Sequence, residues 1–110
     1  MADYVAVAKV GDIPEGEGRC YPVNGTNVAI FFTSEGEYQA INDSCPHAGA
    51  SLAPGHLEGD TVHCPWHAWQ FCTKTGNWLD NPSGKIKVDS YPVRVVGDDI
   101  EVLVDHSDKS

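Results

Sequence analysis

Two short segments of this chain each carry one cysteine and one histidine at a spacing typical of metal ligands. Cys45 and His47 form a Cys-x-His pair, and Cys64 and His67 form a Cys-x-x-His pair, with residues 48–63 between them. Both cysteines are followed directly by proline. Thiolate and neutral imidazole are the donors that bind iron and zinc in proteins, so the four side chains together predict a metal centre.

The order of the four ligands indicates which centre to expect. A usual zinc finger separates a pair of cysteines from a pair of histidines, whereas each pair here is mixed. In a centre with two irons, two thiolates can bind one iron while two imidazoles bind the other. We therefore predict one [2Fe–2S] cluster held by Cys45, His47, Cys64 and His67, and we keep a structural zinc site as the alternative.

The elements that must position these ligands are predicted to be strands. Short segments rich in β-branched and aromatic residues alternate with turn residues, and no long helical period occurs. Asn24-Gly25, the turn at residues 34–37 and Gly97-Asp98-Asp99 each predict a hairpin. The expected strands are residues 4–8, 20–23, 27–32, 38–41, 61–64, 67–72, 78–79, 86–96 and 100–104. The predicted fold class is all-β, an antiparallel sandwich or barrel.

The middle of the chain differs in composition from the rest. Residues 42–59 are rich in Pro, Gly, Ser and Ala and are predicted to be an ordered loop. A length of 110 residues suits one domain, residues 1–110. Within it we expect an inserted, loop-rich, cluster-binding subdomain at about residues 43–84 that holds both ligand pairs.

The formal net charge of −9 argues against a partner that is nucleic acid or an anionic membrane surface. Between Cys45 and Cys72 the only charged residues are Glu58 and Asp60, so we expect an uncharged tip around the metal. The N-terminal residues lack the basic start and apolar run of a secretory signal, and no apolar stretch is long enough to span a bilayer. We therefore expect a soluble, cytoplasmic protein.

At the ligand pairs the sequence resembles the Rieske family, in particular its small soluble ferredoxins. The resemblance is carried by CPHAGASL at residues 45–52, CPWHAWQF at residues 64–71, Thr75-Gly76 and the segment Tyr91-Pro92-Val93. It covers nearly the whole chain. It implies that the two cysteines bind the inner iron and that the two histidines bind the outer iron, near the surface. The same loops are also similar to the small subunit of NAD(P)H-dependent assimilatory nitrite reductases.

Departures from the family's high-potential members predict a low reduction potential. Those members carry an extra cysteine in each ligand loop, where this chain has Ala50 and Trp66. They also hydrogen-bond the cluster through a Ser and a Tyr, where this chain has Trp69 and Phe71. Hydrogen bonds to the sulfurs raise the potential, so their loss predicts a value toward about −150 mV.

Several other residues of chemical interest have ordinary structural roles in this interpretation. His56, His63 and His106 are predicted to be surface or packing histidines. Cys20 and Cys72 are predicted to be buried or half-buried free thiols. Trp69 and Trp78 are expected in the core, whereas Trp66 is a candidate docking anchor beside His67.

Three functions remain open at this point. The first, which we prefer, is an electron carrier without catalysis of its own, between a flavin reductase and a terminal oxygenase or similar redox enzyme. The second is the small [2Fe–2S] subunit of a nitrite reductase, and the third is a zinc-stabilised interaction domain. A complete oxygenase is excluded by size, because its catalytic iron needs a further domain.

Overall fold

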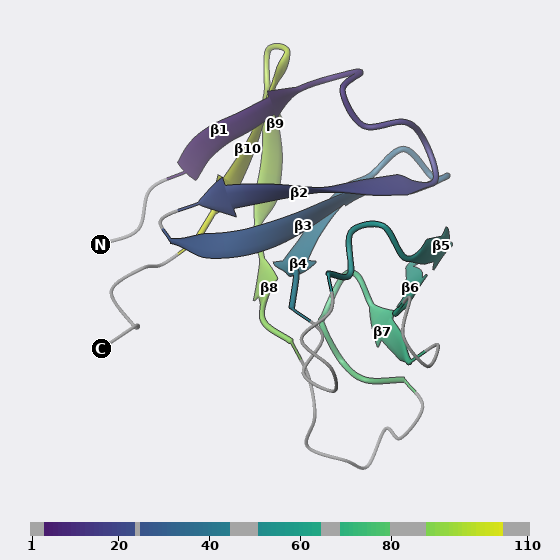
Figure 1. Ribbon diagram of the computed structural model, residues 1–110. Coiled ribbons are helices and arrows are strands. Elements are labelled where there is room, and N and C mark those ends of the chain that lie inside the picture. Colours follow the sequence, from purple (N-terminus) through teal and green to yellow (C-terminus); the bar gives the residue numbers. More distant parts are fainter. Residues whose placement is uncertain (1–3, 24, 45–50, 65–68, 80–87, 105–110) are drawn as a thin grey trace.

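The computed structural model describes residues 4–23, 25–44, 51–64, 69–79 and 88–104. These residues form strands and no helix, and the strands are arranged in three antiparallel sheets (Figure 1). The predicted all-β, antiparallel fold class is confirmed. No helix in the described parts of the chain is long and apolar enough to cross a membrane.

The first sheet has the strand order β1-β10-β9, with β1 at Tyr4–Lys9, β9 at Val93–Val96 and β10 at Asp99–Leu103. The second sheet has the order β2-β3-β4-β8, with β2 at Glu17–Val23, β3 at Thr26–Phe32, β4 at Tyr38–Asn42 and β8 at Ser90–Tyr91. The third sheet has the order β5-β6-β7, with β5 at His56–Glu58, β6 at Thr61–His63 and β7 at Gln70–Cys72. The hairpins predicted at residues 24–25, 34–37 and 97–99 are all present.

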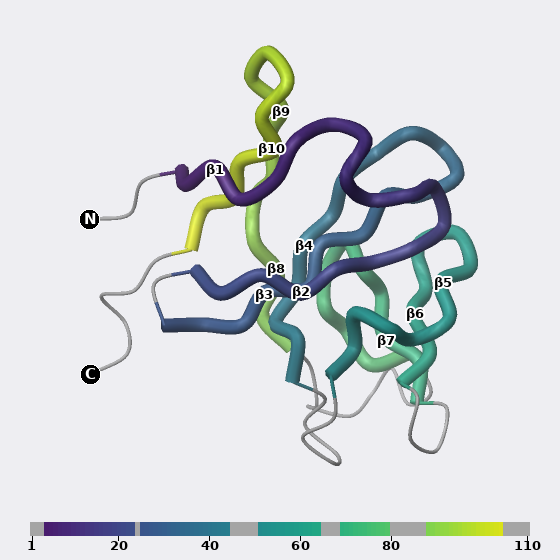
Figure 2. Tube along the Cα trace, turned by 45° about the horizontal axis from the view of Figure 1, so that its top comes forward, coloured from purple at the N-terminus to yellow at the C-terminus, as the bar shows by residue number. Residues whose placement is uncertain are grey.

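The second sheet is the middle layer, because its strand β3 is buried on both faces. Side chains alternate across a strand. Val28 and Ile30 pack in a cluster toward the first sheet, whereas Ala29 and Phe31 pack in a cluster with the third sheet. In both views the third sheet lies apart from the first, with the second between them (Figures 1 and 2). The uninterrupted apolar run in β3 is therefore a sign of burial on two sides.

Three expectations about strands were wrong. Residues 78–79, predicted as a strand, hold only an isolated bridge of Trp78 with Phe71. The segment predicted as one strand at residues 86–96 contains two strands in different sheets, β8 and β9, separated by Pro92. Proline donates no backbone hydrogen bond, so the chain leaves the second sheet here and joins the first. The segment predicted as a loop at residues 42–59 contains β5, which pairs with β6 from His56↔His63 to Glu58↔Thr61.

Candidate metal centre

Cys64 is the one predicted metal ligand that lies in the described residues. Cys45, His47 and His67 lie outside them. Cys64 directly follows β6 and is 3% exposed. Its backbone N–H donates to the carbonyl of Trp69 at 2.7 Å. This bond continues the pairing of β6 with β7 and brings together the two residues that flank positions 65–68.

The segment carrying the other ligand pair is anchored at both of its ends. Ser44 and Ser51, which flank positions 45–50, form an isolated antiparallel bridge. The buried carboxylate of Asp43 accepts hydrogen bonds from Ser51 Oγ at 2.6 Å and from the backbone N–H of Ala53 at 2.8 Å. The carbonyl of Asp43 also accepts from the N–H of Leu52 at 2.7 Å. One residue thus holds the returning end of the segment against the end of β4.

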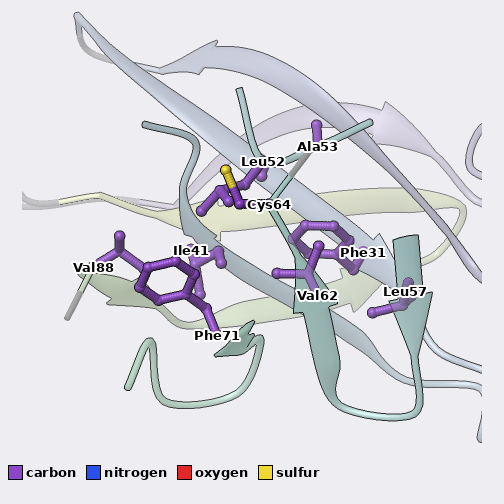
Figure 3. Close-up of a cluster of buried hydrophobic side chains, with 10 residues drawn as sticks. Phe31, Ile41, Leu52, Ala53, Leu57, Val62, Cys64, Phe71 and Val88 are labelled. Carbon is purple, nitrogen blue, oxygen red and sulfur yellow. The ribbon is translucent and has the colours of Figure 1, made fainter. Parts of the chain in front are cut away.

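Described residues from both ligand regions belong to one hydrophobic cluster. Leu52, just after the first ligand pair, and Cys64, in the second, belong to the same buried group. The sulfur of Cys64 lies beside Leu52, with Phe71 on the opposite side of the cluster near Val88 and Ile41 (Figure 3). The fold therefore brings the bases of both predicted ligand segments to neighbouring positions, although residues 53–63 separate them along the chain.

The surroundings of Cys64 suit a ligand to an iron–sulfur cluster. The buried residues that cluster with its sulfur are all hydrophobic, which keeps water away from the site. Trp69 and Trp78 pack against this cluster as half-buried side chains. A buried thiolate needs a compensating positive charge, which metal ions supply. The donor set of two thiolates and two imidazoles fits a [2Fe–2S] cluster with one iron on each donor type.

A third anchor, formed by the backbones of Gly76 and Val88, lies beside the same hydrophobic cluster. The N–H of Val88 donates to the carbonyl of Gly76 at 2.9 Å, and Gly76 N–H donates to the carbonyl of Cys72 at 2.7 Å. Gly76 has a φ of 82°, and a Cβ placed there would lie 2.0 Å from the Val88 carbonyl oxygen. Only glycine fits this position. Residues 80–87, between these anchors along the chain, lie outside the described residues.

A polar network ties this unit to the second sheet. The side chain of Gln39, 7% exposed on β4, donates to Asp60 Oδ1 at 3.2 Å and accepts from the hydroxyl of Thr73. The N–H of Thr73 donates to the carbonyl of Asp60 at 2.7 Å. Buried polar groups are stable only when bonded in this way, so the network fixes how the third sheet sits on β4.

Sequence reasoning missed Asp43 and Gly76 as positioning residues. Asp43 lies in Asn-Asp-Ser directly before the first ligand, and these residue types bond readily to nearby backbone. That pattern could have indicated an anchor. In the sequence, Gly76 contributes only to the family resemblance, because its close contact with Val88 depends on the tertiary structure.

The remaining thiols and histidines are largely as expected, with one correction. Cys72 is half-buried, whereas Cys20 is exposed on β2 rather than in the core; both are free thiols. Partial burial and, secondarily, the Asp43 carboxylate raise the pKa of the Cys20 thiol to about 11. His56 and His63 face one another across β5 and β6 with ring centroids 5.5 Å apart.

Trp69 and Trp78 are half-buried rather than fully in the core. His106, Trp66 and Ala50 lie outside the described residues. The predictions made for them therefore stay predictions.

Comparison with known proteins places these features in a family. The model of the Rieske [2Fe-2S] domain matches residues 3–92. The ferredoxin subunit of 3-phenylpropionate/cinnamic acid dioxygenase from Shigella flexneri serotype 5b is 46% identical over 92 residues, covering 83% of this chain and 84% of the relative.

Solved structures agree with this match. A chain in the complex of reduced oxygenase and oxidised ferredoxin of carbazole 1,9a-dioxygenase superposes with a TM-score of 0.78 at 27% identity, covering 90% of this chain and 91% of that one. A Mycobacterium tuberculosis protein described as the small subunit of a NADH-dependent nitrite reductase superposes with a TM-score of 0.87 at 23% identity, covering 96% and 97%. At that identity, the second likeness shows the fold alone.

Proposed function

Because this chain belongs to the Rieske [2Fe-2S] domain family, with a cluster of that type as its cofactor, we propose that it is a cytoplasmic one-electron carrier for an oxygenase. It is a component of an oxidoreductase system and has no catalysis of its own. Residues 1–110 act as one domain, in which residues 43–84 form the cluster-binding subdomain. The cluster, when bound, supplies the reversible one-electron chemistry, and the chain holds it and shields it from water.

The proposed ligands come from the two segments whose ends the fold anchors. Cys45 and Cys64 bind the inner iron as thiolates, and His47 and His67 bind the outer iron as neutral imidazoles. The observation that carries this assignment is the position of Cys64. It is buried, it is bonded through its N–H to Trp69, and it lies beside Leu52 at the returning end of the first ligand segment.

The choice of an oxygenase as electron acceptor is supported by the curated relative. That protein is named as the ferredoxin subunit of a dioxygenase and shares almost half of the aligned residues with this chain. The nitrite-reductase alternative has only a shared fold in its favour. A flavin reductase is the proposed electron donor, because a one-electron carrier needs a donor that can pass electrons singly.

Docking of these partners is proposed at the histidine end of the cluster. Small, transient interfaces are typical of redox proteins. The proposed contact residues are Pro46, His47, Ala48, Pro65, Trp66, His67 and Pro82, all outside the described residues. With Glu58 and Asp60 as the only charges between Cys45 and Cys72, this contact is largely apolar and the acidic body steers the approach.

The cluster assignment is tested by iron and acid-labile sulfide analysis and by EPR spectroscopy of the dithionite-reduced protein. We expect two irons and two sulfides per chain, and loss of the Rieske signal in His47→Ala and His67→Ala. His106→Ala is a control outside the ligand set and should keep the signal. Stoichiometric zinc without sulfide would contradict the assignment.

The partner assignment is tested by electron transfer to a purified terminal oxygenase of the dioxygenase class, with a sirohaem nitrite reductase as the competing acceptor. Trp66→Ala should slow delivery to the oxygenase while the EPR signal and potential stay unchanged. Unchanged turnover in this variant would mean that Trp66 packs rather than docks. Faster reduction of the nitrite reductase than of the oxygenase would overturn the choice of acceptor.

A further inference from the structure

A cleft of about 400 Å³ lies between β4 and β9, and Cys64 is not among the residues that line it. One side of it is formed by Gly36 and Tyr38, and the other by Val93 and Val95. Lys74, which follows β7, closes one part of the rim. Its volume is in the range of pockets that hold small molecules or short peptide segments.

The backbone of β9 presents unpaired groups to this cleft. The N–H of Leu103 on β10 donates to the carbonyl of Pro92 at 3.0 Å. In an antiparallel pair, residues that bond to the partner strand alternate with residues whose N–H and C=O point away from it. In the register of β9 with β10, Val93 and Val95 therefore direct these groups away from β10. Within the described residues no strand pairs with that edge of β9.

The facing edge of β4 is open in the same way. The N–H of Thr33 donates to the carbonyl of Glu37 at 2.8 Å, so the next residue, Tyr38, turns its N–H and C=O away from β3. On that side β8 pairs only with Ala40 and Ile41. No strand pairing joins β4 to β9 in the parts of the chain that the structure describes. The cleft thus lies between two strand edges.

Lys74 gives the cleft a positive charge that pairs with no carboxylate of the described residues. The other three basic side chains of the described residues each pair with a carboxylate: Lys9 with Asp99, Arg19 with Glu17 and Arg94 with Glu101. Lys74 has no such bond in the described part of the chain. In a protein of net charge −9, this ammonium is a local site of attraction for an anionic group.

A carboxylate that also lines the cleft already has a hydrogen-bond partner. Glu37 lines the cleft, and the Glu37 carboxylate accepts a hydrogen bond from Gln39 at 3.3 Å. Gln39 also bonds to Thr73, the residue before Lys74, so the position of Lys74 is held from β4. An acidic group in the cleft is therefore favoured near Lys74 and disfavoured near Glu37.

From these edges and charges we propose that the cleft is a docking site for an extended peptide segment of a partner protein. The segment adds as a strand to the edge of β9 and places an acidic side chain beside Lys74. Backbone bonds to a free strand edge supply affinity in this mode of recognition, and side-chain pockets supply specificity.

The site is separate from the cluster end of the molecule. Cys64 and Trp69 lie at one end of the β6–β7 hairpin, whereas Thr73 bonds to Asp60 at the other end. A segment bound in the cleft, which Thr73 lines, therefore lies at the end of this hairpin opposite Cys64. The site could therefore tether a partner while the cluster end exchanges electrons, and its existence does not depend on the identity of the electron acceptor.

Panning a phage-displayed library of random heptapeptides against the immobilised holo protein tests the proposal. We expect enriched peptides to carry an acidic residue and, as synthetic peptides, to shift the backbone amide NMR signals of Tyr38, Val93 and Val95. Lys74→Glu should weaken their binding by about tenfold or more, as for a lost charge-assisted bond. Arg19→Glu, with the same charge change outside the cleft, should leave binding unchanged.

A second variant addresses the strand edge itself. Val95→Pro removes an N–H that β10 does not use, so the β9–β10 hairpin should persist while peptide binding is lost. If this variant does not fold, Lys74→Glu decides alone. The proposal is overturned if no peptide is enriched, or if enriched peptides bind Lys74→Glu as tightly as wild type. A dimer that Val95→Pro dissociates would assign the edge to a second copy and would also overturn it.

Discussion

Trp69 and Trp78 stack on one another, with ring centroids 4.2 Å apart and ring planes inclined by 18°. The backbone carbonyl of Trp69 accepts a hydrogen bond from the N–H of Cys64, and Trp78 forms an isolated β-bridge with Phe71 of β7. The stack therefore joins the segment after the third sheet to the residue that holds Cys64. Offset aromatic pairs of this kind contribute about 0.5–1.5 kcal/mol beyond the burial of their surface.

Removing this stack should destabilise the cluster-binding unit. We expect Trp78→Ala to lower the free energy of unfolding by roughly 3 kcal/mol, the lower end for a Trp-to-Ala change, because Trp78 is only half-buried. Urea unfolding measures this, and the near-ultraviolet circular dichroism of the coupled indoles should disappear. Trp78→Phe, which keeps an aromatic ring, is the control. Equal urea midpoints for Trp78→Ala and wild type would contradict the role given to the stack.

Gly76 and Gly97 form a matched pair for testing the contact of Gly76 with Val88. Both have positive φ, 82° and 62°, but a Cβ at Gly97 meets no atom within 4 Å. Gly97→Ala should therefore cost only the backbone strain, about 1–2 kcal/mol. Gly76→Ala adds a collision with the Val88 carbonyl and should cost more than about 3 kcal/mol, with loss of bound iron. Similar thermal midpoints for the two variants would show that the contact between Gly76 and the Val88 carbonyl is not tight enough to exclude a Cβ.

Asp43 should be needed to hold the first ligand segment. Asp43→Ala removes the acceptor for Ser51 Oγ and Ala53 N–H, and hydrogen bonds to charged groups contribute about 1.5–3 kcal/mol each. We expect a lower iron content per chain and a lower urea midpoint. Ser51→Ala, which loses only one of these bonds, should show a smaller effect. Full iron occupancy in Asp43→Ala would show that the Asp43 hydrogen bonds are not needed for cluster binding.

The reduction potential should be low, because Trp69 and Phe71 offer no hydroxyl to the cluster. We expect a wild-type value below about 0 mV, toward about −150 mV, and nearly independent of pH around neutrality. Phe71 is fully buried, so Phe71→Tyr raises the potential only if its new hydroxyl reaches a ligand sulfur. Protein-film voltammetry measures both proteins. A wild-type potential above about +200 mV would exclude the low-potential assignment.

Cys20 should react slowly with alkylating agents despite its exposure. Its pKa is raised from the ordinary 9.0 to about 11, so the thiol stays protonated in the native protein well above neutral pH. Its contribution to stability is intact below pH 9.0 and is lost as the pH rises toward 11. Mass spectrometry of the peptide containing Cys20 should show iodoacetamide labelling at pH 9 at least about tenfold slower than in urea. Equal rates would contradict the raised pKa.

The sequence by itself determined the chemistry and the class of fold. Mixed Cys and His pairs can be recognised from spacing alone, and short β-rich segments between turn residues are local signals that predict strands without knowledge of their partners. The family match agrees with both inferences.

The tertiary structure decided which residues position the site. The segment predicted as one strand is divided at Pro92 between two sheets. Within the segment predicted as a loop, residues 56–58 form β5 because they pair with β6. The Asn-Asp-Ser pattern suggests that Asp43 bonds to nearby backbone, but it does not give Ala53 as the partner. The role of Gly76 depends on its contact with Val88, which no local pattern indicates. Such contacts form only when the sheets have packed, which is the physical reason that the sequence predicted the ligands but not the residues that hold them in place.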